Sequence, residues 1–173
     1  MRKHLNSELG RKSIEEFRKS EKSAFVIVLD NVRSHNNVGS VFRTADAFLT
    51  KKIFLCGITP KPPHRDIQKT ALGATDSVEW SYYEKTTDAV MHLKAECYKI
   101  IGIEQADGAV ELQDIKIEKG QKYALVFGHE VTGVDQKVID LCDMCVEIPQ
   151  FGTKHSFNIA VSAGIVLWEM NKK

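Results

Sequence analysis

Apolar residues occur in short continuous runs along the chain, and these runs predict strands that are buried on both faces. The predicted strands cover residues 24–30, 52–58, 78–80, 98–105, 123–127 and 144–148. Strands covered on both faces are typical of parallel sheets that lie between helices. The pattern therefore predicts an α/β fold with five or six mostly parallel strands and helices on both faces of the sheet.

Between these runs, the apolar residues follow helical spacing. After the first strand they recur at i, i+3, i+4 and i+7, which predicts an amphipathic helix capped by Asn36 or Asn37. Further helices are predicted over residues 86–96 and 134–141, and another helix is expected to end at Gly73.

The last predicted helix is apolar around most of its circumference, and Ser156 is its expected N-cap. The apolar and small residues that lie around most of its circumference are Phe157, Ala160, Val161, Gly164, Ile165, Leu167 and Trp168. Such a helix must be covered on more than one side, and small residues allow a neighbour to approach its backbone closely. We therefore expect a buried helix that either the rest of the chain or a second subunit covers.

The total composition is that of an ordinary globular protein. The 173 residues include 24 Lys and Arg and 23 Asp and Glu, so the net charge of +1 neither favours nor excludes a nucleic-acid partner. The expected organisation is a single domain over residues 1–173, with residues 1–22 as a short charged N-terminal extension. No apolar run has the length of a membrane span and the N-terminus lacks the apolar core of a secretion signal, so a cytoplasmic location without a membrane partner is expected.

Two segments carry local positive charge. Residues 1–22 are either a solvated, partly frayed helix or an arm that contacts RNA. Residues 59–66 contain three prolines and form a loop, which either holds phosphates or is a flexible surface loop. Its basic residues and those near it are Lys61, His64, Arg65 and Lys69.

Several common classes of site are excluded by missing motifs. Neither GxGxxG nor GxxxxGK[ST] is present, so a nicotinamide or P-loop enzyme is not expected, and no GxSxG forms a nucleophile elbow. The cysteines are Cys56, Cys97, Cys142 and Cys145, and small buried thiols are the favoured interpretation. Cys142 and Cys145 form a CxxC without a second ligand pair, so no metal site is expected.

Polar residues gather where the predicted strands end, which is where open α/β sheets bind ligands. Asn36, Ser40 and Arg43 share one stripe of the first helix. Gly128 ends a strand, and its missing Cβ would let a ligand approach the backbone.

Three segments carry a resemblance to a known family. Residues 37–45 (NVGSVFRTA), 125–134 (LVFGHEVTGV) and 148–165 (IPQFGTKHSFNIAVSAGI) resemble, in order and spacing, the three motifs of the SpoU (TrmH-type) RNA 2'-O-ribose methyltransferases of the SPOUT superfamily. The resemblance covers about residues 24–170. It implies a C-terminal trefoil knot, S-adenosylmethionine bound at the knot, and a homodimer that shares its active sites.

The resemblance also implies which residues bind the cofactor. Backbone groups at Ile103, Gly128 and Ile148 would hold it, together with Ser156 and Phe157 from the last loop. Main-chain recognition beside an apolar slot is the usual construction of a small-molecule pocket.

In the family, the arginine that matches Arg43 is assigned to activating the ribose 2'-hydroxyl. The residues that match Asn37, Glu130, Ser156 and Asn158 arrange the site, although Glu130 and Asn158 could instead be purely structural. A guanidinium stays protonated and is a poor proton acceptor. We therefore expect Arg43 to stabilise the developing alkoxide and to clamp the adjacent phosphate.

The expected function is methyl transfer to a ribose 2'-hydroxyl of tRNA or rRNA, without a metal. One alternative is a catalytically inactive RNA- or ribosome-binding member of the fold. Another is a different S-adenosylmethionine or nucleotide enzyme on the same scaffold, for example one that acts on protein. His129 and His155 stand beside motif residues and could take a proton, but neither is assigned to catalysis. The N-terminal segment and residues 59–69 are the candidate RNA surface.

Overall fold

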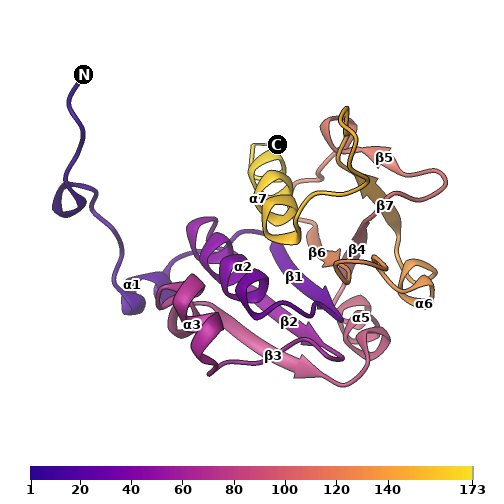
Figure 1. Ribbon diagram of the computed structural model, residues 1–173, viewed down its shortest axis with the longest axis horizontal. Coiled ribbons are helices and arrows are strands. Elements are labelled where there is room, and N and C mark those ends of the chain that lie inside the picture. The colour runs from indigo at the N-terminus through magenta and orange to yellow at the C-terminus, as the bar shows by residue number, and fades with distance from the viewer. Residues whose placement is uncertain (173) are drawn as a thin grey trace.

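The computed structural model describes residues 1–172, and within them it contains a seven-stranded sheet (Figure 1). The strands are β1 Phe25–Asp30, β2 Lys52–Cys56, β3 Glu79–Tyr83, β4 Tyr98–Ile103, β5 Val110–Glu111, β6 Lys122–Phe127 and β7 Met144–Glu147. Their order is β3-β2-β1-β6-β4-β7-β5, and the paired strands are parallel throughout. The predicted parallel sheet is therefore confirmed. β5 escaped prediction because two residues are too few to show a period.

Helices cover both faces of the sheet, as predicted. On one face lie α2 His35–Ala47, α3 Arg65–Ala71, α4 Ala74–Ser77 and α7 Ile159–Met170. On the other face lie α5 Thr86–Ala95 and α6 Gln136–Ile139. None of the helices in residues 1–172 is long and apolar enough to cross a membrane.

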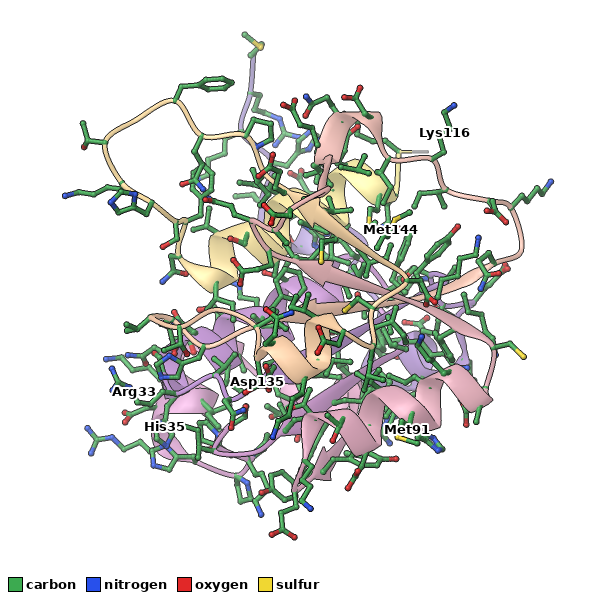
Figure 2. The ribbon with its side chains drawn as sticks, turned by 90° about the vertical axis from the view of Figure 1, so that its right-hand side faces the viewer. Arg33, His35, Met91, Lys116, Asp135 and Met144 are labelled. Atoms are coloured by element: carbon green, nitrogen blue, oxygen red, sulfur yellow. The ribbon has the colours of Figure 1, made fainter. Side chains whose placement is uncertain are left out.

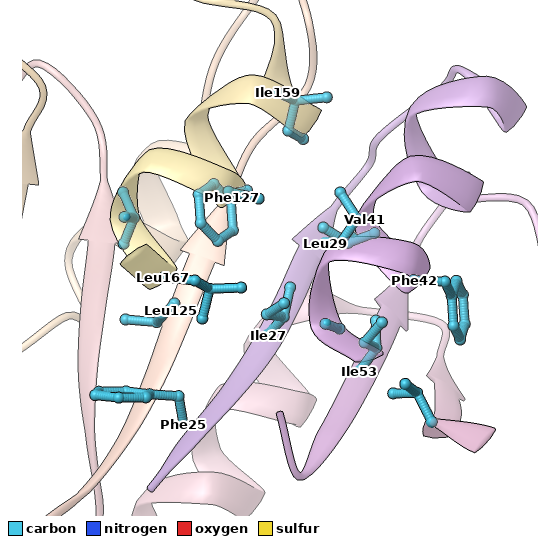
Figure 3. Close-up of a cluster of buried hydrophobic side chains, with 14 of the residues drawn as sticks. Phe25, Ile27, Leu29, Val41, Phe42, Ile53, Leu125, Phe127, Ile159 and Leu167 are labelled. Carbon is cyan, nitrogen blue, oxygen red and sulfur yellow. The ribbon is translucent and has the colours of Figure 1, made fainter. Parts of the chain in front are cut away.

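The central strand β1 shows how the two layers share one sheet. Ile27 pairs with Ile53 of β2 and Leu125 of β6, and these side chains belong to the core beneath α2 and α7 (Figure 3). Val26 and Val28, which alternate with Ile27, belong to the core beneath α5. The continuous apolar run is therefore required because successive side chains enter two different cores.

The N-cap of α2 is Ser34, whereas Asn36 or Asn37 was predicted. The hydroxyl oxygen of Ser34 accepts a hydrogen bond from the backbone N–H of Asn37 at 3.3 Å. Gly39 then allows α3 to approach α2, because a Cβ at this position would lie 2.3 Å from the carbonyl oxygen of Ile67. The glycine of the first motif thus serves helix packing.

The last helix begins two residues later than predicted. Its N-cap is Asn158, whose side-chain oxygen accepts a hydrogen bond from the Ala160 N–H at 2.9 Å, whereas Ser156 remains in the exposed loop before it. α7 packs against α2, and the chain reaches it from β7, which lies between β4 and β5 in the sheet (Figure 1). The trefoil knot in this region stays a prediction.

The chain covers α7 on one side only. Ala163, Val166 and Leu167 are buried, whereas Val161 is 49% exposed and Trp168 is 60% exposed. Within a single chain an apolar stripe of this helix therefore remains open, and its cover by a second subunit stays a prediction.

The N-terminal segment is partly anchored. η1 covers Asn6–Glu8 and α1 covers Ile14–Lys19, and the buried Phe17 joins α1 to the main core. The Arg18 guanidinium donates a hydrogen bond to the carbonyl oxygen of Asp76 in α4. Arg11 and Lys12 precede this anchor and are exposed.

The four cysteines are free thiols. Burial raises the pKa of both Cys56 and Cys142 to about 12, which makes these two thiols unreactive. Cys97 is exposed, so the prediction of a buried thiol is wrong there. Within residues 1–172, no cluster of three or more His, Cys, Asp or Glu side chains is placed to hold a metal ion.

Candidate active site

A cavity of about 530 Å³ opens beside the carboxyl ends of β4, β6 and β7. All five predicted cofactor-binding residues line it, and so do three of the five predicted catalytic residues, with Ser156 belonging to both groups: Ile103, Gly128, Glu130, Ile148, Ser156, Phe157 and Asn158. The cavity lies where open α/β sheets bind ligands, and its volume is that of a small-molecule pocket. Its roles in catalysis and binding remain predictions.

The walls of the cavity differ in character. Phe127, Val146 and Ile159 supply apolar surface, whereas Glu104 and Glu147 add carboxylates. A flat apolar ring could pack against the first group, and a positively charged ligand would be favoured beside the second.

The loop after β6 folds tightly back on itself, and two glycines make this possible. A Cβ at Gly128 would lie 2.1 Å from the carbonyl carbon of Gly133. His129 and Gly133 exchange two backbone hydrogen bonds, of 3.0 and 2.9 Å. The space left by the missing Cβ of Gly128, where a ligand was expected to approach, is therefore filled by the backbone of Gly133 and Val134. Gly133 has a φ of 70°, and a Cβ there would lie 2.2 Å from Oε2 of Glu104.

Two carboxylates from other strands hold the end of this loop. Glu104, directly after β4, accepts a hydrogen bond from the Val134 N–H at 2.9 Å. Asp30, the buried last residue of β1, accepts one from the Asp135 N–H at 2.9 Å and another from the Thr86 hydroxyl. Sequence reasoning missed both roles, and the only available signal was a single acidic residue at a strand end.

Glu130 joins the same loop to the start of α2. One carboxylate oxygen accepts from the Arg33 N–H at 3.0 Å, and the other accepts from the Ser34 N–H at 2.9 Å and from Nδ2 of Asn37 at 3.0 Å. Burial alone would raise the pKa of Glu130, but these hydrogen bonds outweigh it and hold the pKa below its ordinary value. Glu130 is therefore a poor proton acceptor at neutral pH.

The hydrogen bonds continue from Glu130 to α7. Nδ2 of Asn158 donates to Oδ1 of Asn37 at 3.0 Å, and Oδ1 of Asn158 accepts from the Ala160 N–H. Each amide group has one donor and one acceptor in use, so their orientations are determined by the network. Asn37, which lies outside the cavity lining, thus connects two residues that line it.

The two histidines beside the site differ in their contacts. Nδ1 of His129 accepts from the N–H groups of Val131 and Thr132 at 3.1 and 3.3 Å, which makes this nitrogen a structural acceptor. His155 is exposed, and its carbonyl oxygen accepts from Nε2 of Gln105 at 2.9 Å. These contacts give His129 a loop-stabilising role.

Arg43 lies outside the cavity of this chain. Its side chain is exposed on α2 and makes no hydrogen bond or ion pair within residues 1–172. It follows Asn37 by six residues, which corresponds to about 9 Å along a helix axis. The structure thus brings together all of the predicted site residues except Arg43.

We expect Glu130→Gln to lower the free energy of unfolding by about 1 to 3 kcal/mol near neutral pH, because an NH₂ group would then face backbone N–H groups. The folded-state pKa of Glu130 is lowered, so its stabilisation is fully present above the ordinary value of 4.5 and is lost as the pH falls through the folded-state pKa. Urea unfolding from about pH 7 down to about pH 3 measures this. Glu84→Gln, at an exposed carboxylate, is the control. Equal stability of the two variants near neutral pH would contradict the role of Glu130.

Comparison with known proteins assigns the chain to a family. The sequence profile of the SpoU rRNA Methylase family matches residues 24–168. The tRNA (guanosine(18)-2'-O)-methyltransferase of Escherichia coli K12 is 26% identical over 85% of this chain and 62% of its own length. The 23S rRNA (guanosine-2'-O-)-methyltransferase RlmB of Neisseria meningitidis is 31% identical over 86% of this chain and 58% of its own length. The AdoMet-bound rRNA methyltransferase of Sinorhizobium meliloti superposes with a TM-score of 0.81 at 26% identity, over 90% of this chain and 59% of its own. The chain thus spans about three fifths of these relatives, and it belongs to the SpoU rRNA Methylase family.

Proposed function

We propose that this protein is an S-adenosylmethionine-dependent RNA methyltransferase that modifies a ribose 2'-hydroxyl of tRNA or rRNA. The observation that carries the proposal is the cavity at three strand ends, lined by two of the family's motifs and tied to the third by Asn37. The family membership and the 2'-O-methyltransferase relatives support it.

The residues around the cavity fit this cofactor. Backbone groups at Ile103, Gly128 and Ile148 would hold it, with Ser156 and Phe157 at the open side. Glu104 supplies negative charge that suits a sulfonium and an ammonium group.

The bound cofactor would supply an activated methyl group, so the protein has to position the ribose and stabilise charge on its oxygen. Arg43 provides a permanently charged guanidinium that stabilises the developing alkoxide and clamps the neighbouring phosphate. Glu130, Asn37 and Asn158 keep α2 in place relative to the cavity. With Glu130 and Nδ1 of His129 already engaged, proton loss is concerted with transfer or assisted by solvent.

The proposal is tested by incubating the purified protein with radiolabelled S-adenosylmethionine and total RNA, followed by nuclease digestion and mass spectrometry. Label in 2'-O-methylnucleosides supports it, and the same experiment with RNA from cells lacking the protein identifies the substrate. Label in protein would favour an enzyme that acts on protein. Absence of cofactor binding by calorimetry would favour the inactive RNA- or ribosome-binding alternative, which the presence of Arg43, Glu130, Ser156 and Asn158 disfavours.

We expect Arg43→Lys to lower kcat about 100-fold, because a lysine keeps the charge but loses the planar fork that binds an oxyanion and a phosphate together. Cofactor affinity should stay unchanged, since Arg43 lies outside the cavity. Single-turnover methylation and calorimetry measure the two effects. Lys94→Arg, at a surface lysine of α5 paired with Asp143, serves as the control because it lies outside the proposed RNA surface. Near-full kcat in Arg43→Lys would contradict the assigned role.

We propose that the active form is a homodimer in which α7 forms part of the interface. The open stripe of α7 contains Val161, Gly164 and Trp168, and nothing lies within 4 Å of a Cβ placed on Gly164. Trp168 contacts Phe48, the C-cap of α2, at a ring-centroid distance of 6.5 Å. A partner seated on this stripe would lie close to α2, which is consistent with an Arg43 that serves a shared active site.

Trp168→Glu should weaken the dimer about 30-fold or more, because a charge would replace a large aromatic anchor. Sedimentation velocity over a range of concentrations measures the change. Met91→Glu on α5 is the matched control, since Met91 is equally exposed on a helix of the opposite face (Figure 2). If both variants show the same dissociation constant as the unchanged protein, the interface lies elsewhere.

RNA is proposed to contact the N-terminal segment and residues 59–69. Reversing the charge of Arg11 and Lys12, or of Lys61 and Arg65, should weaken RNA binding and reduce the slope of log affinity against log salt by about 0.7 per lost phosphate contact. The matched control is reversal of Lys116 and Lys119, which are exposed in the loop before β6 (Figure 2). An unchanged slope in both test variants would rule out this surface.

A further inference from the structure

Two histidine rings pack against each other beside the candidate active site. The ring centroids of His35 and His64 lie 3.9 Å apart, with the ring planes tilted by 37°. His35 is the first residue of α2 and is half-buried, whereas His64 is exposed and directly precedes α3. The pair presents an aromatic surface. Its formation could not be read from the sequence, because the two histidines are 29 positions apart in the chain.

The His64 ring is held by a backbone hydrogen bond, and His35 is placed by its position at the start of α2. Nδ1 of His64 accepts a hydrogen bond from the Asp66 N–H at 3.2 Å, so the ring proton lies on Nε2. His35 follows Ser34, whose N–H donates to Glu130. The pair therefore exists without a ligand, and His35 is the immediate neighbour of Ser34, a member of the network that borders the cavity.

Cationic residues stand near the two histidines in the sequence. Arg33 and Arg65 are close in sequence to the two histidines and are exposed, and Lys61 lies over the ring of Tyr82 at 4.1 Å. Arg33 and His35 lie at one edge of the molecule, on the side of the loop that contains Glu130 (Figure 2). Aromatic surface flanked by arginines is the combination that binds unpaired nucleotides, because bases stack on rings and phosphates pair with guanidinium groups.

We infer that the His35–His64 pair is a stacking subsite for the base of an unpaired RNA nucleotide next to the one that is methylated, with Arg33 and Arg65 holding its phosphates. The inference rests on the proposed function because it takes RNA as the partner. It adds that the RNA segment beside the target ribose is single-stranded, since a base within a duplex has no free face for the rings.

The test uses a fluorescein-labelled oligoadenylate and an abasic ribose-phosphate oligomer of equal length, with binding to the full chain followed by anisotropy. His35→Ala and His64→Asn should each weaken oligoadenylate binding about tenfold and leave the abasic oligomer unaffected. The asparagine introduced by His64→Asn can still cap α3, so this variant removes the ring without removing the cap. His35→Phe should restore binding because it keeps a ring. Arg33→Ala should weaken both oligomers.

His92→Ala on α5 is the control, because this histidine is also exposed and contacts an aromatic ring, that of Tyr83. Equal loss for both oligomers, or the same affinity in His35→Ala as in His92→Ala, would overturn the stacking subsite. Calorimetry with S-adenosylmethionine separates this inference from the proposed function. If the protein bound no cofactor but stacked oligoadenylate on the pair, the proposed function would fail and the subsite would stand. If the protein bound the cofactor and methylated RNA, and neither activity changed in the two histidine variants, the proposed function would stand and the stacking subsite would fail.

Discussion

The hydrogen-bond chain from Glu130 through Asn37 to Asn158 is the interaction on which the arrangement of the site depends. It joins the loop after β6, the start of α2 and the start of α7, which are the three segments that resemble the family motifs. Because the carboxylate also accepts two backbone N–H groups, its charge is compensated without a cationic partner among residues 1–172. Consecutive hydrogen bonds in such a chain strengthen one another and fix a single geometry. This suits a site that works mainly by positioning its substrate.

The strands and the sheet type could be predicted from the sequence because continuous apolar runs have one good structural explanation. The helix starts could not, since Asn37 and Asn158 are both good caps by residue type and only the folded chain decides which capping group each one uses. Asn158 caps α7 with its side-chain oxygen, while its amide nitrogen donates to Asn37. Because Ser34 caps α2, the side chain of Asn37 is available to bind Glu130. Tertiary hydrogen bonds of this kind leave no periodic trace.

Most of the cavity was predicted through the motif resemblance, and physical reasoning explains why the motif residues are of these types. Gly128 and Gly133 allow the loop to return on itself, and Gly39 allows two helices to meet. The supporting carboxylates Asp30 and Glu104 were missed because a lone acid at a strand end is ambiguous in sequence. Arg43 was correctly placed on α2, but its separation from the cavity could not be foreseen, because it depends on how the helix is rotated over the sheet.

The position of β7 has a consequence for how the protein is made. This strand is the last to be synthesised, yet it lies between β4 and β5, and the residues that follow it form one wall of the cavity. A nascent chain on the ribosome can assemble β1, β2 and β3 early, whereas β4 keeps an unpaired edge until β7 arrives. The cavity is therefore completed only after the residues that follow β7 have been synthesised, so translation products that stop before them would be unable to sequester a small molecule there.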